Sequence, residues 1–294
     1  MLLHVLHRTT FVYAGPARDS FNEVRLRPVD DDRQRCTRFN LGIKPLTGEV
    51  RDYFDYYGNR VHYFDLPDQH RRLTIEAESD VETVPESRRP PIPVVPTAPA
   101  PSHFAGDRAP GLELYAEYLT ESHYVPLAVE LWREMQDVFA IVPRTDIWTD
   151  TRHLGRHIYS TFSYKPKTTG VGTLATDVLA QRVGVCQDYA HVLLGLCRIA
   201  GIPARYVSGY FFNDSREPGT PEASHAWVEV LLPGFGWVGY DPTHDRPADE
   251  RYIKIAAGRD YADIRPVSGT YRGAPTRELR VEVAVRAADA SASK

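Results

Sequence analysis

Residues 184–203 read GVCQDYAHVLLGLCRIAGIP and have the spacing of a helix. An α-helix turns once every 3.6 residues, so side chains that recur at three- and four-residue intervals share one face. The residues at this spacing are small or apolar: Cys186, Ala190, Leu193, Leu194 and Cys197. Gly201 and Pro203 then end the helical pattern. The stretch predicts a helix from about residue 186 to residue 200, with one face packed into a core.

The segments on the two sides of this helix differ in periodicity. Before it, apolar residues recur at helical spacing, and after it the pattern alternates with the period of two that is typical of strands. The helical segments are 112–119, 127–140, 149–162 and 173–179, and the strand segments are 204–212, 224–232, 236–241, 252–256 and 279–285. Helices followed by strands in one region predict an α+β fold, with helices packed on a mostly antiparallel sheet.

The first 85 residues alternate with a period of two, in short runs separated by turn residues such as Gly58 and Asn59. They predict an all-β sandwich of six or seven strands. Eight prolines between residues 85 and 110 are incompatible with a helix or a central strand. We therefore expect a β-sandwich domain at 1–85, a Pro-rich linker at 86–111, an α+β core at 112–286 and a flexible tail at 287–294.

The composition is that of a soluble globular protein. The 294 residues are 42% hydrophobic and 25% charged, which excludes global disorder. The net charge of −4 argues against a general nucleic-acid binder, because such proteins carry an excess of positive charge. No run of about 20 apolar residues could span a bilayer, and the first eight residues do not have the pattern expected of a signal peptide. Three cysteines are too few for a disulfide scaffold, so we expect a cytoplasmic protein with neither a nucleic-acid nor a membrane partner.

Cys186 is placed at the first turn of the expected helix. A helix N-terminus carries a partial positive charge and free N–H groups, and both favour a thiolate over a thiol. The same N–H groups can receive an oxyanion. Cys197 lies three turns deeper on the same face and is expected to be an inert core residue. Cys186 is therefore the candidate nucleophile, although Asp188 at the helix start opposes thiolate formation.

A thiolate nucleophile needs a base, and the base needs a group that orients it. His225 opens one expected strand and Asp241 ends the next, after a turn at 233–236. In one possible register, the residue numbers of each pair of opposite residues on the two strands add up to 468. The side chains of His225 and Asp241 then share a face as diagonal neighbours, close enough to meet. A register sum of 469 places them on opposite faces. The spacing by itself does not choose between the two registers.

Several runs resemble the bacterial transglutaminase-like superfamily. In the second half they are GVCQDYAH at 184–191, GIPARYVSGY at 201–210, SHAWVE at 224–229 and GWVGYDPT at 236–243, with Phe162, Ser163 and Tyr164 as a further element. In the first half, TTFVY at 9–13, RLRP at 25–28, Gly58 with Asn59, and LTI at 73–75 are similar to the β domain that precedes this core in many bacterial members. The resemblance covers nearly the whole chain.

The resemblance implies a papain-like α+β core with a Cys, His, Asp triad in that chain order. By matching positions, Cys186 is the nucleophile, His225 the base and Asp241 the orienting acid. The antiparallel arrangement of the family's His and Asp strands also selects the even register. The backbone N–H of Cys186 would bind the oxyanion, and Tyr164 would stand where well-studied transglutaminases use an indole N–H.

Other residues near these motifs have simpler interpretations. His191 follows Cys186 by five positions, on a different helix face, and is expected to be structural, while His244 and Asp245 are expected at a loop edge. Trp227 and Trp237 are expected to be buried strand residues. No Cys or His pair has the spacing of a zinc site, and no acidic loop has the EF-hand pattern. We therefore expect neither a metal nor a cofactor.

These features predict thiol-dependent acyl transfer on a peptide or glutamine amide, through a thioester. Water as acyl acceptor gives a cysteine protease or amidase, and we favour this outcome. An amine as acceptor gives a transglutaminase, which remains the alternative because the triad is the same for both. A binding module that kept the fold without turnover is a third interpretation, and the intact triad argues against it. The first domain would, in addition, restrict which protein or peptide substrate reaches the thiol.

Overall fold

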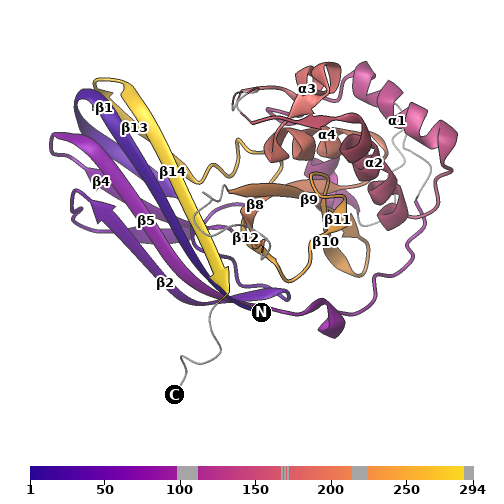
Figure 1. Ribbon diagram of the computed structural model, residues 1–294, viewed down its shortest axis with the longest axis horizontal. Helices are drawn as coiled ribbons and strands as arrows, with labels where there is room; N and C mark the ends of the chain where they lie inside the picture. Colours follow the sequence, from indigo (N-terminus) through magenta and orange to yellow (C-terminus); the bar gives the residue numbers. More distant parts are fainter. Residues whose placement is uncertain (98–111, 167, 169, 171, 214–223, 288–294) are drawn as a thin grey trace.

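The computed structural model describes residues 1–97, 112–166, 168, 170, 172–213 and 224–287. A long antiparallel sheet lies beside a compact part in which helices cover a second sheet (Figure 1). The α+β fold class expected from the sequence is confirmed. Residues 98–111 of the expected linker and 288–294 of the expected tail lie outside the described residues. No helix in the described part of the chain is long and apolar enough to cross a membrane.

The N-terminal sheet is built around one long strand, β1 (Leu2–Val24). Its partners from the first part of the chain give the order β2-β5-β1-β4-β3, with β2 at Gln34–Lys44, β3 at Arg51–Phe54, β4 at Arg60–Leu66 and β5 at His70–Thr83. The beginning of β1 pairs with β5 and its end pairs with β4, with a register shift between Val12 and Ala17. One strand therefore serves both halves of a single curled sheet.

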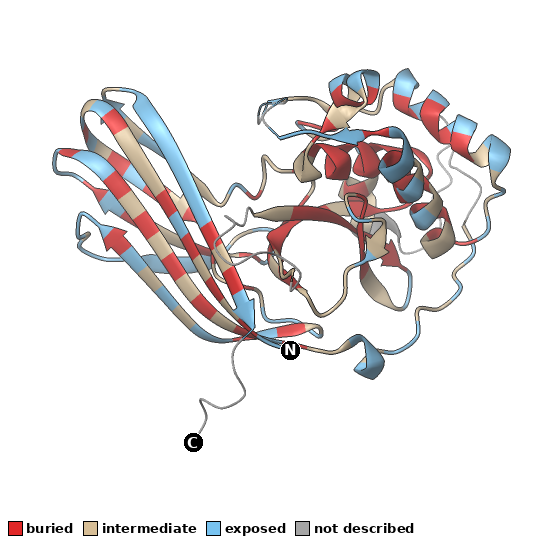
Figure 2. Cartoon of the chain, viewed as in Figure 1, coloured by how far each residue is buried: buried red, intermediate tan, exposed pale blue. Residues whose placement is uncertain are grey.

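Alternate residues of these strands form the core of the curled sheet. Leu73, Ile75 and Ala77 of β5 are buried and belong to the same apolar cluster as Phe64 and Leu66 of β4. Successive strand residues point to opposite faces, and buried and exposed bands alternate along these strands in Figure 2. The expected sandwich of six or seven strands is thus one seven-stranded sheet that curls around its own core.

The C-terminal strands differ from the expected domain division. Strands β13 (Val267–Gly273) and β14 (Thr276–Ala287) pair with β1, so residues 267–287 join the N-terminal sheet and not the core at 112–286. The predicted strand at 279–285 lies within β14. Its partner could not be foreseen, because alternation marks a strand but does not specify the strand it pairs with. Val283 and Val285 are buried there.

The second sheet has the order β11-β10-β9-β8-β12 and is antiparallel in every pairing described. Its strands are β8 (Ala204–Phe211), β9 (His225–Leu232), β10 (Gly236–Asp241), β11 (Arg246–Pro247) and β12 (Tyr252–Gly258). The helices are α1 (Val129–Ile141), α2 (Ile147–Thr161), α3 (Ala175–Gln181) and α4 (Cys186–Ile199). The expected helix at 112–119 is a 3₁₀ helix, η2 (Leu112–Leu119). A short parallel pair joins β6 (Ser163–Tyr164) to β7 (Val183–Gly184).

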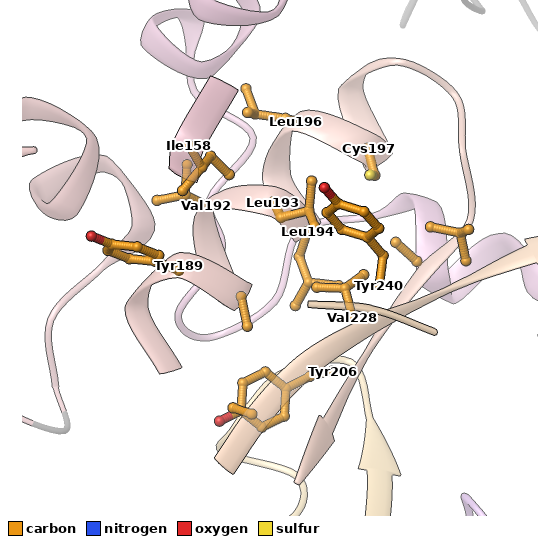
Figure 3. Close-up of a cluster of buried hydrophobic side chains, with 14 of the residues drawn as sticks. Ile158, Tyr189, Val192, Leu193, Leu194, Leu196, Cys197, Tyr206, Val228 and Tyr240 are labelled. Carbon is orange, nitrogen blue, oxygen red and sulfur yellow. The ribbon is translucent and has the colours of Figure 1, made fainter. Parts of the chain in front are cut away.

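Helix α4 is the centre of the α+β part. It packs on β8 and β9 with one side, and α1, α2 and α3 cover the other. Leu193 and Leu194 are fully buried, and Figure 3 shows them beside Val228 and Tyr240 of the sheet. The helix predicted at 186–200 is therefore present, but it is buried on nearly all sides because three other helices enclose it.

The N-terminal sheet is attached to the outer edge of β12. The side-chain amide of Gln34 accepts from the N–H of Lys254 at 2.7 Å and donates to its carbonyl at 2.8 Å. Asn59 does the same at Ala257, at distances of 2.8 and 2.9 Å. Two amide side chains thus continue the strand's hydrogen bonding where β12 has no strand neighbour on that side.

The burial of α4 leads to a stability prediction. Leu194→Ala should lower the free energy of unfolding by about 2–5 kcal/mol, because it leaves a cavity that the surrounding helices cannot fill. Urea denaturation measures this loss. Leu46→Ala is the matched control, since Leu46 is 91% exposed and its truncation should change stability by less than about 0.5 kcal/mol. Equal effects for the two variants would contradict the central role of α4.

Candidate active site

Cys186 is held at the start of α4 by a tight strand-to-helix connection. The Asp188 carboxylate accepts a hydrogen bond from the N–H of Val185 at 2.7 Å, which fixes the residue before the thiol. A Cβ at Gly184 would lie 2.6 Å from the Cβ of Asp188, so only glycine allows this approach. Tyr164 pairs with Gly184 across β6 and β7. The thiol therefore projects from the first turn of a helix whose entry is fixed.

The register of β9 and β10 brings His225 and Asp241 together. Gly236 pairs with Leu232 and Trp237 with Leu231, so paired positions sum to 468. This is the even register, and the two side chains share a face as predicted. The Nε2 of His225 lies 2.7 Å from Oδ2 of Asp241. Because a carboxylate only accepts, this ring nitrogen carries a proton, and Nδ1 is left to face another partner.

Asp241 is fully buried, and each of its carboxylate oxygens accepts hydrogen bonds. Besides His225, Oδ2 accepts from Nδ1 of His244 at 2.7 Å and from the hydroxyl of Tyr252 at 2.8 Å. Oδ1 accepts from the N–H of Thr243 at 2.7 Å. Burial raises the pKa of Asp241, but the charge and hydrogen bonds of His225 and His244 outweigh it and hold this pKa far below its ordinary value. The carboxylate is therefore ionised at any physiological pH.

His225 is held in its protonated form. Burial by itself lowers the pKa of this imidazole, but the charge of Asp241, their hydrogen bond and a further hydrogen bond with the Cys186 side chain raise it to about 10. At neutral pH the ring is an imidazolium between a carboxylate and a thiol.

A cavity of about 280 Å³ opens on these groups. Cys186 and His225 line it, together with Tyr164, Phe211, Asn213, Ser224, Thr243 and His244. Tyr164, the residue that the resemblance suggests as an oxyanion donor, is 50% exposed and lines this cavity. The structure thus brings the four residues predicted from the sequence into one place.

The remaining sequence expectations can be compared with their positions. Cys197 is buried, and burial raises its pKa to about 12, so it is an inert core thiol as expected. His191 is also buried, stacks on Tyr124 and accepts from the N–H of Tyr261, which confirms a structural role. Trp227 is buried beside the ring of His225, with ring centroids 6.3 Å apart.

Two residues at the site were missed by sequence reasoning. His244 was expected at a loop edge, but its ring bonds to Asp241 and lines the cavity, because the chain turns back immediately after β10. The motif spacing contained a signal, since His244 follows Asp241 by three residues. Tyr252 comes from β12, and nothing in the sequence indicated that its hydroxyl would reach Asp241. Asp245 bonds instead to Tyr240 and Arg156.

His225, Asp241 and His244 are also a set that could hold a metal ion, since their ligand atoms lie within 4.8 Å of one another. These atoms already bond to each other, at 2.7 Å in both His–Asp pairs. A metal would therefore have to displace the protons that orient His225. Sequence motifs for metal sites do not detect these three residues, because they come from two strands and the loop that follows.

Comparison with other proteins identifies the family. The model for the bacterial transglutaminase-like N-terminal region matches residues 3–82, and that for the transglutaminase-like superfamily matches residues 143–242. An uncharacterised protein of Mycobacterium leprae is 37% identical over 290 residues, which cover 96% of this chain and 98% of that protein. The chain belongs to the transglutaminase-like superfamily. The resemblance stated from the sequence motifs is confirmed.

A solved structure and a second sequence are also similar to this transglutaminase-like chain. A crystal structure from Cytophaga hutchinsonii, provisionally described as a cysteine protease, superposes with a TM-score of 0.75 at 23% identity. It covers 98% of this chain and 92% of that one, so the two share their fold over nearly their full length. A protein-glutamine gamma-glutamyltransferase of Pseudomonas aeruginosa is 34% identical over 135 residues, 42% of this chain and 20% of that protein.

The buried His225–Asp241 pair gives a pH prediction. A folded-state pKa of about 10 for His225, above its ordinary 6.5, means that its contribution to stability is complete below pH 6.5 and is lost as pH rises through about 10. Asp241→Asn should therefore lower the free energy of unfolding by about 3–5 kcal/mol at pH 7. The difference from the unmodified protein should shrink towards pH 10 and above, as measured by urea unfolding at several pH values.

The control for this pH series is Asp137→Asn, because Asp137 is exposed on α1. It should leave stability nearly unchanged at each pH. A loss of stability in Asp241→Asn that stays constant between pH 7 and pH 11 would show that His225 does not carry the raised pKa.

Proposed function

We propose that this protein is a thiol-dependent acyl-transfer enzyme that hydrolyses peptide or glutamine amides through a thioester. The observation that carries the proposal is the position of His225, which is hydrogen-bonded to the buried Asp241 carboxylate and lines the same cavity as Cys186. A buried Asp241 keeps Nε2 protonated, so Nδ1 is available for proton exchange at the thiol. Membership of the transglutaminase-like superfamily supports the same chemistry.

The first half-reaction forms the thioester. The Cys186 thiolate attacks the amide carbonyl carbon, and the new oxyanion accepts from the backbone N–H of Cys186, with the Tyr164 hydroxyl as a second donor at the cavity. The first N–H groups of a helix have no partner within the helix, so this donor is available. The imidazolium of His225 gives its proton to the leaving nitrogen, the C–N bond breaks, and an amine leaves.

The second half-reaction releases the acyl group. Neutral His225 takes a proton from the attacking water, which adds to the thioester carbonyl, and the collapse of this adduct returns Cys186 as a thiolate beside a protonated ring. The polar side chains that line the cavity, such as Asn213 and Ser224, can hold this water. A reduced thiol is required throughout. The three free cysteines fit our proposal that the protein works in the cytoplasm.

An amine as acyl acceptor is the second candidate. It is favoured by the 34% identity to the Pseudomonas aeruginosa gamma-glutamyltransferase over 135 residues. An amine would enter the same thioester in place of water, so the residues that form the thioester serve both reactions.

The activated thiol can be tested without a substrate. Iodoacetamide labelling at pH 7, followed by peptide mass mapping, should modify Cys186 rapidly, because the thiolate is the reacting form. His225→Ala should slow this labelling by about tenfold or more. Cys36 and Cys197 are internal controls, since burial raises the pKa of both thiols. If Cys186 reacts no faster than Cys36, the thiol is not activated. That result would contradict the proposed enzyme and favour the binding module.

The acyl acceptor requires a separate experiment. A glutamine-containing peptide is incubated with the protein, with and without a fluorescent primary amine, and the products are resolved by mass spectrometry. We expect hydrolysed product in both reactions and no amine adduct. An amine adduct as the main product would establish the transferase instead. Cys186→Ala should abolish either product, because no thioester can form.

A further inference from the structure

A second cavity, larger than the one at Cys186, lies between the N-terminal sheet and the α+β part. Its volume is about 740 Å³, within the range of cavities that hold small ligands and short peptides. It is lined by residues 31–33, by the segment that follows β5 and by the turn between β9 and β10. It shares no lining residue with the cavity at Cys186.

Three arginines that line this cavity form no ion pair with a described residue; Arg88 is exposed, whereas Arg33 and Arg89 are partly buried. Arg33 donates to the carbonyl of Trp237 at 3.0 Å, and Arg89 donates to the carbonyls of Val84 and Ala248 at 3.1 and 3.0 Å. Neither guanidinium forms an ion pair with a described residue within 4.0 Å. Burial lowers the pKa of Arg89 and the charge of Arg33 adds to this effect, which outweighs the opposing effect of nearby carboxylates, so the two cations repel each other in a partly desolvated space. Such a pair favours an anion between them.

The other deep cations of the cavity are already compensated. Arg205 and Lys254 both contact the buried carboxylate of Glu229, at 2.6 and 2.9 Å. Lys254 also pairs with Asp31 at 2.7 Å. Among the partly buried lining residues that the structure describes, Arg33 and Arg89 are therefore the arginines without a direct ion pair.

The walls of the cavity are apolar, and its rim is acidic. Pro91, Phe235 and Trp237 line it, and such surfaces bind hydrocarbon stems. Asp32 and Glu86 are exposed lining residues, and their negative charges oppose a multiply charged ion such as phosphate. The lining therefore suits a ligand that has one carboxylate attached to an apolar group.

We propose that this cavity binds a peptide carboxylate, with Arg33 and Arg89 as the anion-binding pair and the apolar walls holding the adjoining residues. The carboxylate can be a chain terminus or an acidic side chain, since both present the same group. This site is independent of the function proposed for Cys186. It lies on the sheet face that carries His225, beyond Trp227 and Glu229 on the same strand.

The test is isothermal titration calorimetry on the full chain with Cys186→Ala, which prevents turnover. The probes are acetyl-LLE-amide, which has a side-chain carboxylate, acetyl-LLL with a free C-terminus, neutral acetyl-LLQ-amide and inorganic phosphate. We expect at least one carboxylate peptide to bind more than tenfold tighter than the neutral peptide and phosphate. The better of the two carboxylate peptides identifies the source of the group.

The variants locate the binding. Arg33→Gln and Arg89→Gln should each weaken binding of that peptide by about tenfold or more, whereas Arg35→Gln, an exposed neighbour outside the cavity, should not. Should the glutamine variants unfold, Arg33→Lys and Arg89→Lys keep the charge, and they should still weaken binding because the guanidinium fork is lost. No binding of either carboxylate peptide, tighter binding of phosphate, or affinity unchanged in all the Arg33 and Arg89 variants would overturn the proposal.

Discussion

The carboxylate of Asp241 is the group on which the active-site geometry depends. A buried charge is costly unless every acceptor position is used, and here one carboxylate accepts from two imidazoles, a tyrosine hydroxyl and a backbone N–H. The partners come from the start of β9, the turn after β10 and the start of β12. A shift in any of these segments would remove a hydrogen bond from a buried charge. The electrostatics of Asp241 thus fix both the orientation of His225 and the alignment of the strands that carry it.

The two faces of the second sheet carry different groups of side chains. One face packs on α4 through Val228, Val230 and Tyr240, and this packing places the helix whose first residue is the thiol. The other face carries His225 and Asp241, then Trp227, then the ionic group around Glu229. Because side chains alternate along a strand, alternate residues of β9 and β10 supply the two faces. The thiol comes from the helix and its base from the sheet, and they meet only at the edge where α4 begins.

The sequence predicted the parts of this site that depend on local pattern. The helical spacing from Cys186 to Cys197 and the alternation of β9 and β10 gave the elements, and the family motifs selected the register that places His225 beside Asp241. Contacts between distant segments were not accessible in this way. Tyr252 reaches Asp241 only because β12 pairs with β8, and β14 joins the N-terminal sheet because β1 has an open edge. Alternation identifies such strands but contains no information on their partners.

The attachment of the N-terminal sheet explains why the two parts act as one structure. Strand β12 is an edge strand, and edges expose unpaired N–H and C=O groups that invite unwanted pairing. Gln34 and Asn59 satisfy these groups at Lys254 and Ala257. The same strand carries Tyr252, which donates to Asp241. Since the C-terminal strands return to β1, removing the N-terminal residues would free this edge and leave β13 and β14 without their partner. The N-terminal sheet is therefore part of the structural support of the Asp241 carboxylate.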